Sequence, residues 1–482
     1  MIKIKYYFLI CSIIYSCLSL HAFAKDLLIK NARLIDGIKT SSKLMDILIQ
    51  DGIILKIGYD ILNNEAEILD INGANILPGL IDAHVHLQWV PGSVYRKDDP
   101  EMLHKFRMHH LRAYLASGVT TVLDTGISAP VLENIQKYLK SGGIGPNVFA
   151  LAPTFIAKNG YLGDQMKLPQ WGPHWRAANS EHDIKLLFKQ YNGIPNIIGV
   201  KVHIEFGFGP FDIWPIHTPE IRKLILKESE KFKLPIYVHS HEKRERKIAL
   251  EMGAHAMTHN IAMEGIPSDE FIQSMKIKGT YLTTTICNSE LKLVYHNPER
   301  LQDPLIKLTV PKEQILTASD PDSWELMSQI TFRNAVFPKA TPNFIPDLLS
   351  PLMLDKDQII KLYNNVRKSI FAMYEAGIPI VVGSDSGNLP HFVNMFHGPS
   401  TIKEIELLGK TGIPNIDVIS SATRIPAEMM GIDNIVGTID VGKRADLIVV
   451  KEDPLEDLRA LRNLLWVIKD GEVRNPKDWI LK

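Results

Sequence analysis

The chain is 482 residues long, and its 45% apolar and 22% charged content is that of a globular protein, which excludes disordered and collagen-like classes. The 54 basic residues equal the 54 acidic ones, so a nucleic acid is not expected as a partner. The length allows one large domain and one smaller domain.

Residues 1–24 have the pattern of a secretory signal peptide. A short basic start is followed by an apolar stretch and by Ala22-Phe23-Ala24, the small-residue pattern of a signal-peptidase site. We expect cleavage before Lys25 and an exported protein, periplasmic or secreted; a retained membrane anchor and a lipoprotein anchored at Cys17 are the alternatives. No later run reaches about 18 apolar residues, so the mature chain is not expected to insert stably into a membrane.

The two flanks of the remaining chain share one pattern. Residues 25–75 and 431–482 contain short apolar strands joined by Asp-Gly and Gly-Lys turns, which is typical of antiparallel β structure. We predict that both flanks together form one small β domain. Residues 76–430 form the large domain in this prediction.

Eight apolar, strand-like runs recur in the large domain, and most are separated by stretches with helical character. In one such stretch Thr218 is predicted to cap a helix whose first residue is Pro219. Apolar strands that alternate with helices indicate a (β/α)8 TIM-type barrel, in which chemistry takes place at the carboxyl ends of the strands. The runs are ILPGLIDAHVHL, GVTTVLDTG, NVFALAPTFI, IIGVKVHIEF, PIYVHSHE, AHAMTHN, TYLTTTIC and PIVVGSDSG.

Two connections between these strands are unusually long. Residues 157–180 are rich in aromatic residues and glycine, and residues 288–378 separate the seventh strand from the eighth. Long barrel loops often act as lids or substrate pockets, so we expect these two loops to determine substrate preference.

Six ionisable residues stand at the far ends of the apolar strands. His84 and His86 lie two positions apart, so they share one face of the first strand and can converge on one point. A single buried histidine is commonly a satisfied core residue, but a whole set in the same strand position would demand many separate polar partners. A metal satisfies them all at once. The predicted metal ligands are His84, His86, Lys201, His239, His259 and Asp385.

Lys201 is the most informative member of this set. Between Val200 and Val202, a charged ammonium would lose its hydration at a large cost or give up its proton. A neutral lysine amine can react with CO2, and the resulting carbamate has two oxygens that can bridge two cations about 3.5–4 Å apart. The alternative is a lysine that extends to the barrel mouth as a substrate contact.

Four motifs, ILPGLIDAHVHL, GVTTVLDTG, ALEMGAHAMTH and GTIDVGKRADLIVV, give the chain a resemblance to a known family. They are similar to the signature strand, the second strand, the approach to the sixth strand and the closing β segment of the amidohydrolase superfamily. The chain most resembles the binuclear branch with imidazolonepropionase-like proteins, prolidase-type dipeptidases and carboxypeptidase-like ochratoxin hydrolases. It departs from that branch after Lys201, where HIEFGFGPFDIWP is bulkier than the usual small residues.

The resemblance implies two divalent ions, and zinc is the expected metal. The HxH histidines and Asp385 would hold the first ion, His239 and His259 the second, and carboxylated Lys201 would bridge them. A hydroxide shared by the ions would attack a carbonyl that they polarise. Asp385 would take its proton and pass it to the leaving amine.

His241 shares a face with His239 and could replace it as a ligand, although the first histidine of VHSH better matches the family position. We expect His241 to be a catalytic residue that contacts the substrate or the transition state, or else a residue that supports the ligands from behind.

Three weaker candidates for binding a substrate carboxylate are His174, Arg176 and Arg244, and a plain surface role is the alternative for each. HEKRERK, residues 241–247, is expected to form a helix surface. Cys287, on the predicted seventh strand, is expected to pack in the core.

We predict an exported, binuclear metal-dependent amidohydrolase that cleaves the amide bond of a small molecule, a dipeptide or an N-acyl amino acid. One alternative is a mononuclear cyclic-amide hydrolase or deaminase of the same superfamily, against which Lys201 argues. An alternative from another class is a non-catalytic barrel that serves as a binding module, but such proteins usually lose ligands. Hydrolysis of a lactone or a phosphotriester would use the same site, and a homo-oligomer is compatible with the barrel.

Overall fold

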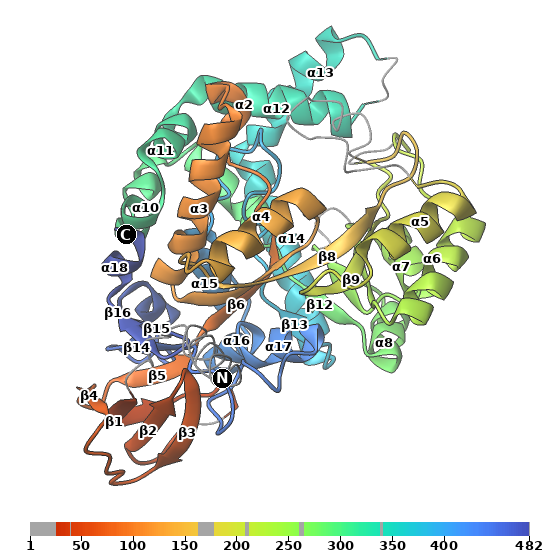
Figure 1. Ribbon diagram of the computed structural model, residues 1–482. Coiled ribbons are helices and arrows are strands. Elements are labelled where there is room, and N and C mark those ends of the chain that lie inside the picture. The colour runs from red at the N-terminus through yellow and green to blue at the C-terminus, as the bar shows by residue number, and fades with distance from the viewer. Residues whose placement is uncertain are drawn as a thin grey trace, which may run out of the picture.

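The computed structural model describes residues 26–38, 40–161, 178–207, 212–259, 265–337 and 341–481 (Figure 1). Within these ranges the chain forms one sheet closed into a barrel, a second open sheet and helices around the barrel. The predicted (β/α)8 barrel, with a β structure built from both ends of the chain, is confirmed. Among the helices in these ranges, none has both the length and the apolar character needed to cross a membrane.

All eight predicted barrel strands form, and neighbouring strands pair in parallel. The first and last strands close the ring, because Ala83 N donates to Val382 O at 3.0 Å and Asp385 N donates to His84 O at 2.8 Å. Closure brings the carboxyl ends of the strands to one rim. The strands are β6 (Leu80–Val85), β7 (Val119–Asp124), β8 (Asn147–Phe155), β9 (Ile197–His203), β10 (Ile236–His239), β11 (Ala256–Thr258), β12 (Tyr281–Thr283) and β13 (Ile380–Val381).

Helices follow the barrel strands and pack apolar side chains against them. The helix α6 (Pro219–Phe232) begins as predicted, because Thr218 Oγ1 accepts a hydrogen bond from Ile221 N at 3.4 Å and Pro219 takes the first helical position. The other helices of this layer are α3 (Pro100–Ala116), α4 (Ala129–Lys140), α5 (Glu181–Tyr191), α7 (Lys243–Glu251), α8 (Asp269–Lys278), α14 (Lys356–Glu375) and α15 (Pro399–Gly409).

Apolar side chains fill the barrel interior near the amino ends of the strands. The helix α17 (Arg424–Met430), which follows α16 (Asn415–Ser421), places Met429 in a buried cluster with Ile81 and Tyr237 from two barrel strands. Polar side chains are therefore concentrated at the opposite, carboxyl end of the barrel.

The connection between β12 and β13 is helical, so the expectation of a loop over residues 288–378 is wrong for the residues described there. Its helices bury a cluster of their own around Trp324 and Met327. Asp303 and Asp355 cap two of these helices, and such caps are signals that the sequence carries. The elements before α14 are α9 (Cys287–Glu290), η3 (Leu291–Val294), η4 (Pro298–Gln302), α10 (Pro304–Thr309), α11 (Lys312–Ser319), α12 (Pro321–Ala335), α13 (Phe344–Leu349) and η5 (Ser350–Leu354).

The second sheet joins strands from both ends of the chain, which lie side by side in Figure 1. The pairing is mixed, because β1 runs parallel to β4 and β5, so the purely antiparallel prediction is wrong at these two pairs. The order is β16 (Glu472–Arg474), β15 (Leu464–Lys469), β14 (Leu447–Val450), β5 (Asn75–Pro78), β1 (Leu27–Leu34), β2 (Met45–Gln50) and β3 (Ile53–Gly58), with β4 (Glu67–Asp70) beside β1. Further short helices are α2 (Ser93–Arg96), η6 (Leu458–Arg462) and α18 (Pro476–Ile480).

Candidate metal centre

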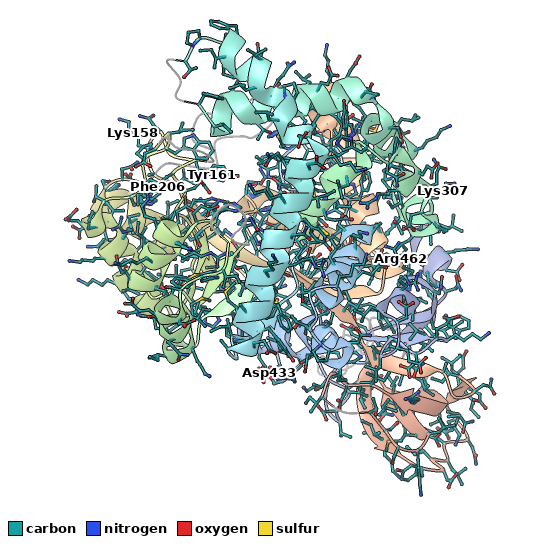
Figure 2. All side chains as sticks on the ribbon, turned by 180° about the vertical axis from the view of Figure 1, so that it is seen from behind. Lys158, Tyr161, Phe206, Lys307, Asp433 and Arg462 are labelled. Atoms are coloured by element: carbon teal, nitrogen blue, oxygen red, sulfur yellow. The ribbon has the colours of Figure 1, made fainter. Side chains whose placement is uncertain are left out.

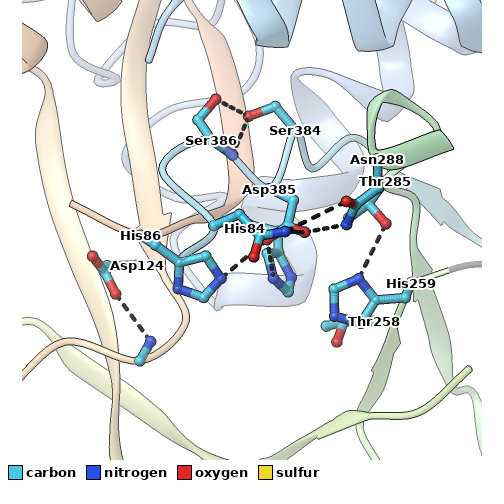
Figure 3. Close-up of polar contacts among 12 residues, drawn as sticks. His84, His86, Asp124, Thr258, His259, Thr285, Asn288, Ser384, Asp385 and Ser386 are labelled. Atoms are coloured by element: carbon cyan, nitrogen blue, oxygen red, sulfur yellow. Dashed lines mark hydrogen bonds and ion pairs between the residues drawn. The ribbon is translucent and has the colours of Figure 1, made fainter. Parts of the chain in front are cut away.

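The predicted ligands come from five strands and meet at the carboxyl rim of the barrel, where Figure 3 shows four of them. His84 lies in β6, Lys201 in β9 and His239 at the end of β10. His259 and Asp385 follow β11 and β13 in left-handed backbone conformations, with φ of 77° and 58°. Such conformations are costly for residues other than glycine and are often retained where function needs them.

Asp385 and the two histidines of the first strand form one group of possible ligands (Figure 3). Asp385 Oδ1 lies 3.1 Å from His86 Nε2 and 3.4 Å from His84 Nε2. Asp385 Oδ2 accepts hydrogen bonds from the side-chain amides of Asn288 and Asn388. These two amides leave Oδ1 as the oxygen that faces the histidines.

Three more histidines form a second group. One ligand atom from each of His239, His241 and His259 can be chosen so that all three lie within 4.8 Å of one another. The same holds for His84, His259 and Asp385, so His259 belongs to both groups. The two groups therefore overlap at His259.

Second partners determine which ring nitrogen of two histidines faces the centre. Glu205 Oε2 lies 3.2 Å from His239 Nε2, which leaves Nδ1 of that ring for an ion. Thr285 Oγ1 lies 3.1 Å from His259 Nδ1, which leaves Nε2 (Figure 3). Histidine ligands are commonly oriented in this way through their other nitrogen.

Lys201 is buried and forms no ion pair within the described residues. Its side chain is 1% exposed, its Nζ donates to Thr258 Oγ1 at 2.8 Å, and within the described residues it forms no ion pair with a carboxylate. Burial lowers the pKa of Lys201 to about 7, although the charge of Asp385 partly opposes this shift. A substantial fraction of Lys201 is therefore a neutral amine near neutral pH.

Burial also keeps four imidazoles of the site neutral. It lowers the pKa of His84 to about 3 and holds the pKa values of His239, His241 and His259 well below their usual range. Burial opposes ionisation of Asp385, but its contacts with two histidines outweigh burial and hold its pKa well below the usual range. The site offers neutral imidazoles and a carboxylate, the forms that bind metal.

Unsatisfied polar atoms show that a metal fits these residues. Within the described chain, Nδ1 of His84 and Nδ1 of His86 are buried without a hydrogen-bond partner, and His84 Nε2 lies 3.4 Å from Asp385 Oδ1. Buried polar atoms without partners are rare and costly, and a cation would satisfy such nitrogens.

Comparison with protein families identifies the family of the chain that carries this site. The amidohydrolase family model matches residues 75–474. The chain belongs to the amidohydrolase family. Among curated relatives of this amidohydrolase, a dihydroorotase of Streptococcus pneumoniae is 34% identical over 110 residues, which is 23% of this chain and 24% of that protein. A dihydroorotase of Aquifex aeolicus is 31% identical over 142 residues, 29% of this chain and 32% of that protein. The chain therefore matches only about a quarter to a third of the length of these relatives.

Solved structures similar to this amidohydrolase extend over nearly its whole length. A Xaa-Pro dipeptidase with bound methionine in its active site has a TM-score of 0.69 and 24% identity, covering 93% of this chain and 99% of that one. The ochratoxinase of A. niger has a TM-score of 0.66 and 18% identity, with 94% and 97% covered. At these identities the likeness shows the fold. A prolidase-type dipeptidase and an ochratoxin hydrolase are also named in the resemblance that the sequence motifs gave. Membership of the amidohydrolase family supports a metal-dependent hydrolase that acts on carbon–nitrogen bonds.

His203 and Glu205 lie at the site of this amidohydrolase but are not among the predicted residues. The ring of His203 stacks on that of His239 with centroids 4.8 Å apart, and both its nitrogens are buried without a hydrogen-bond partner in the described chain. Tyr161, labelled in Figure 2, stacks on His239 at 4.8 Å as well. The alternation that joins His84 to His86 also joins Lys201, His203 and Glu205, so this signal was present in the sequence.

The prediction that residues 241–247 form a helix surface is wrong for two of them, Glu245 and Arg246, which are 2% and 0% exposed. Arg246 donates to His259 O at 2.5 Å and to His241 O at 3.3 Å. It thereby ties together the backbones of two site histidines.

The remaining candidates are three proposed substrate contacts and Cys287. His174 and Arg176 fall outside the described residues. Arg244 is exposed, pairs with Asp212 at 2.5 Å and lies 3.7 Å from the ring centroid of Phe206, so its role as a substrate contact stays a prediction. Cys287 begins α9 rather than lying on the seventh strand, and it packs in the core as expected.

Proposed function

We propose that this protein is an exported, binuclear amidohydrolase that cleaves the amide bond of a dipeptide or an N-acyl amino acid. The position of Lys201, a buried amine with a pKa near 7 beside the histidines and Asp385, carries this proposal. Its nitrogen can attack the carbon of CO2, form an N–C bond and release one proton. The carbamate would be the bridging anion that a pair of cations needs.

Side chains of the protein transfer the proton, orient the ligands and contact the substrate. When bound, two divalent ions, zinc in this proposal, polarise the substrate carbonyl and activate water. Asp385 stays ionised, so it can accept a proton and donate it to the leaving amine. Asn288 and Asn388 hold its Oδ2 and keep Oδ1 toward the centre. His241, at the edge of the second group, contacts the substrate or the transition state.

The choice of a linear amide follows the likeness to a Xaa-Pro dipeptidase and an ochratoxinase over more than nine-tenths of the chain. A second candidate is hydrolysis of a cyclic amide at a single ion. The segment shared with dihydroorotases favours this second candidate, although it covers only 23% of the chain.

Metal content per chain, measured on the purified protein and on Lys201→Ala, tests the binuclear centre first. We expect a ratio near two that falls in the variant. A ratio near one that the substitution leaves unchanged would remove the carbamate bridge and favour the cyclic-amide candidate.

A substrate panel tests the reaction. The zinc-loaded protein should hydrolyse members of a set of dipeptides and N-acyl amino acids. Hydrolysis of cyclic amides alone would favour the second candidate, and hydrolysis of lactones or phosphotriesters alone would contradict both.

Export is proposed from the sequence of residues 1–24. Fractionation of the producing cells and the N-terminal sequence of the recovered protein test it, and the expected mature chain begins at Lys25. Recovery from the soluble cell interior with Met1 in place would contradict it.

A further inference from the structure

Glu205 is a buried carboxylate that contacts two histidines of the site. It follows β9, is 1% exposed, and places Oε2 3.2 Å from His239 Nε2 and 3.8 Å from His241 Nε2. Its other oxygen, Oε1, accepts a hydrogen bond from Gly207 N at 2.8 Å. Oε2 thus faces two histidine rings, and Oε1 is held by the backbone.

The two loops that carry Glu205 and His241 are held together by Glu245, at the start of α7. Glu245 accepts hydrogen bonds from Phe206 N at 2.9 Å and from His241 N at 2.7 Å. Because these donors are backbone groups on either side of the contact, Glu205 cannot easily move away from His239.

A neutral imidazole carries one N–H donor and one acceptor nitrogen. The ionised form of Glu205 can only accept, so its contact with His239 places the proton on Nε2 and the lone pair on Nδ1, the nitrogen available to an ion. We propose that Glu205 is a positioning residue that fixes the tautomer and orientation of His239 for metal binding. This inference rests on the proposed metal centre and adds to it a residue outside the predicted ligands.

Two conservative variants separate the contact from the charge. In Glu205→Gln, the single amide oxygen is needed by Gly207 N–H, so the NH2 group faces His239 Nε2 and drives its proton onto Nδ1. In Glu205→Asp, the charge remains but the side chain is one methylene shorter and cannot reach both partners. We expect both variants to bind one of the two ions about 10- to 100-fold more weakly.

Zinc affinity, measured by competition with a chromophoric chelator, and the visible spectrum of the cobalt-loaded protein are the readouts. Asp46→Asn is the matched control, because Asp46 is also buried and accepts two backbone hydrogen bonds, from Asn31 N at 3.2 Å and Ile61 N at 2.9 Å, but lies in the second sheet. Its affinity and cobalt spectrum should equal those of the unmodified protein.

Three results would overturn the inference. Unchanged affinity in both Glu205 variants would show that the contact is unnecessary. Loss in Glu205→Gln but not in Glu205→Asp would show that charge alone matters. Equal loss in Asp46→Asn would show general loosening of the fold. If the unmodified protein itself binds no zinc, the proposed metal centre fails instead, and the two failures are thereby distinguished.

Discussion

Two buried strand lysines, one in the barrel and one in the second sheet, have opposite surroundings. Lys469 in β15 lies 3.3 Å from Asp446 Oδ1 and also pairs with Asp470. Lys201 in β9 is at least as buried, yet its recorded hydrogen bond goes to the neutral hydroxyl of Thr258. Ion pairs compensate the charge of Lys469, whereas Lys201 has the more distant charge of Asp385 and no ion pair within the described residues.

The same contrast holds for other polar groups of the two regions. Asp46 in β2 accepts hydrogen bonds from Lys30 Nζ at 2.6 Å, Ile61 N at 2.9 Å and Asn31 N at 3.2 Å. At the barrel rim, Nδ1 of His84 and both ring nitrogens of His203 are buried without a hydrogen-bond partner in the described chain. Buried nitrogens without partners are tolerated at functional sites, where a bound ligand or ion can supply the missing bond.

The largest effect is expected from removing the one carboxylate of the proposed centre. Asp385→Asn should lower kcat/KM by about 100- to 10,000-fold, because an amide cannot accept the proton in the reaction. Asp46→Asn, the counterpart in the second sheet, should leave kcat/KM unchanged and lower only the free energy of unfolding. Equal activity of Asp385→Asn and the unmodified protein, measured on the best substrate of the panel, would exclude Asp385 as the proton shuttle.

The two lysines should respond to methionine with opposite signs in the metal-free protein. Lys469→Met leaves Asp446 buried without its countercharge, so the free energy of unfolding should fall by about 3–5 kcal/mol. Lys201→Met removes a group whose charge is penalised by burial, so the free energy of unfolding should rise while zinc binding is lost. Urea denaturation of both variants measures the difference. A fall in both would show that Lys201 is compensated like Lys469.

The sequence predicted the barrel and the convergence of its ligands because both depend on local periodicity. Apolar strands alternate with helices, and a residue at a strand end must reach the common rim whatever the loops do. The helices between β12 and β13 were not predicted, because their burial depends on packing around Trp324 that no local pattern specifies. Glu205 was missed although the alternation along β9 puts it on the face of Lys201, because its partner His239 lies on the next strand and the pairing of β9 with β10 brings them together.

The pH dependence of stability should differ in sign between the two regions. Burial raises the pKa of Glu404 in α15 to about 7, so its folded form keeps a proton that the unfolded chain has lost. Its contribution to stability is fully present below about pH 4.5 and is lost as the pH rises through 7. Burial opposes ionisation of Asp46, but the hydrogen bond from Lys30 and the backbone donors lower its pKa. Its contribution is present above about pH 3.8 and is lost as the pH falls below that value.

Unfolding midpoints of the metal-free protein between pH 3 and 8 test both signs when Glu404→Gln and Asp46→Asn are included. Glu404→Gln mimics the protonated acid, so it should remove the fall in stability between pH 4.5 and 7. Asp46→Asn should reduce the loss of stability that occurs as the pH falls below about 3.8. A steeper fall in Glu404→Gln than in the unmodified protein would contradict the assigned sign.

The smallest expected effects separate two threonines, one at the metal centre and one on the outer helical layer. Thr285→Val removes the hydroxyl beside His259 Nδ1, so zinc affinity should fall about tenfold with little change in unfolding. Thr218→Ala removes the cap of α6, so the free energy of unfolding should fall by about 1 kcal/mol with unchanged zinc affinity. Both are losses of about 1 kcal/mol, since a tenfold change in affinity corresponds to about 1.4 kcal/mol. The two losses appear in different measurements, zinc affinity for Thr285→Val and unfolding for Thr218→Ala, because only Thr285 contacts the ring of a proposed ligand, His259. If both substitutions lowered zinc affinity equally, the contact of Thr285 with His259 would have no specific role in metal binding.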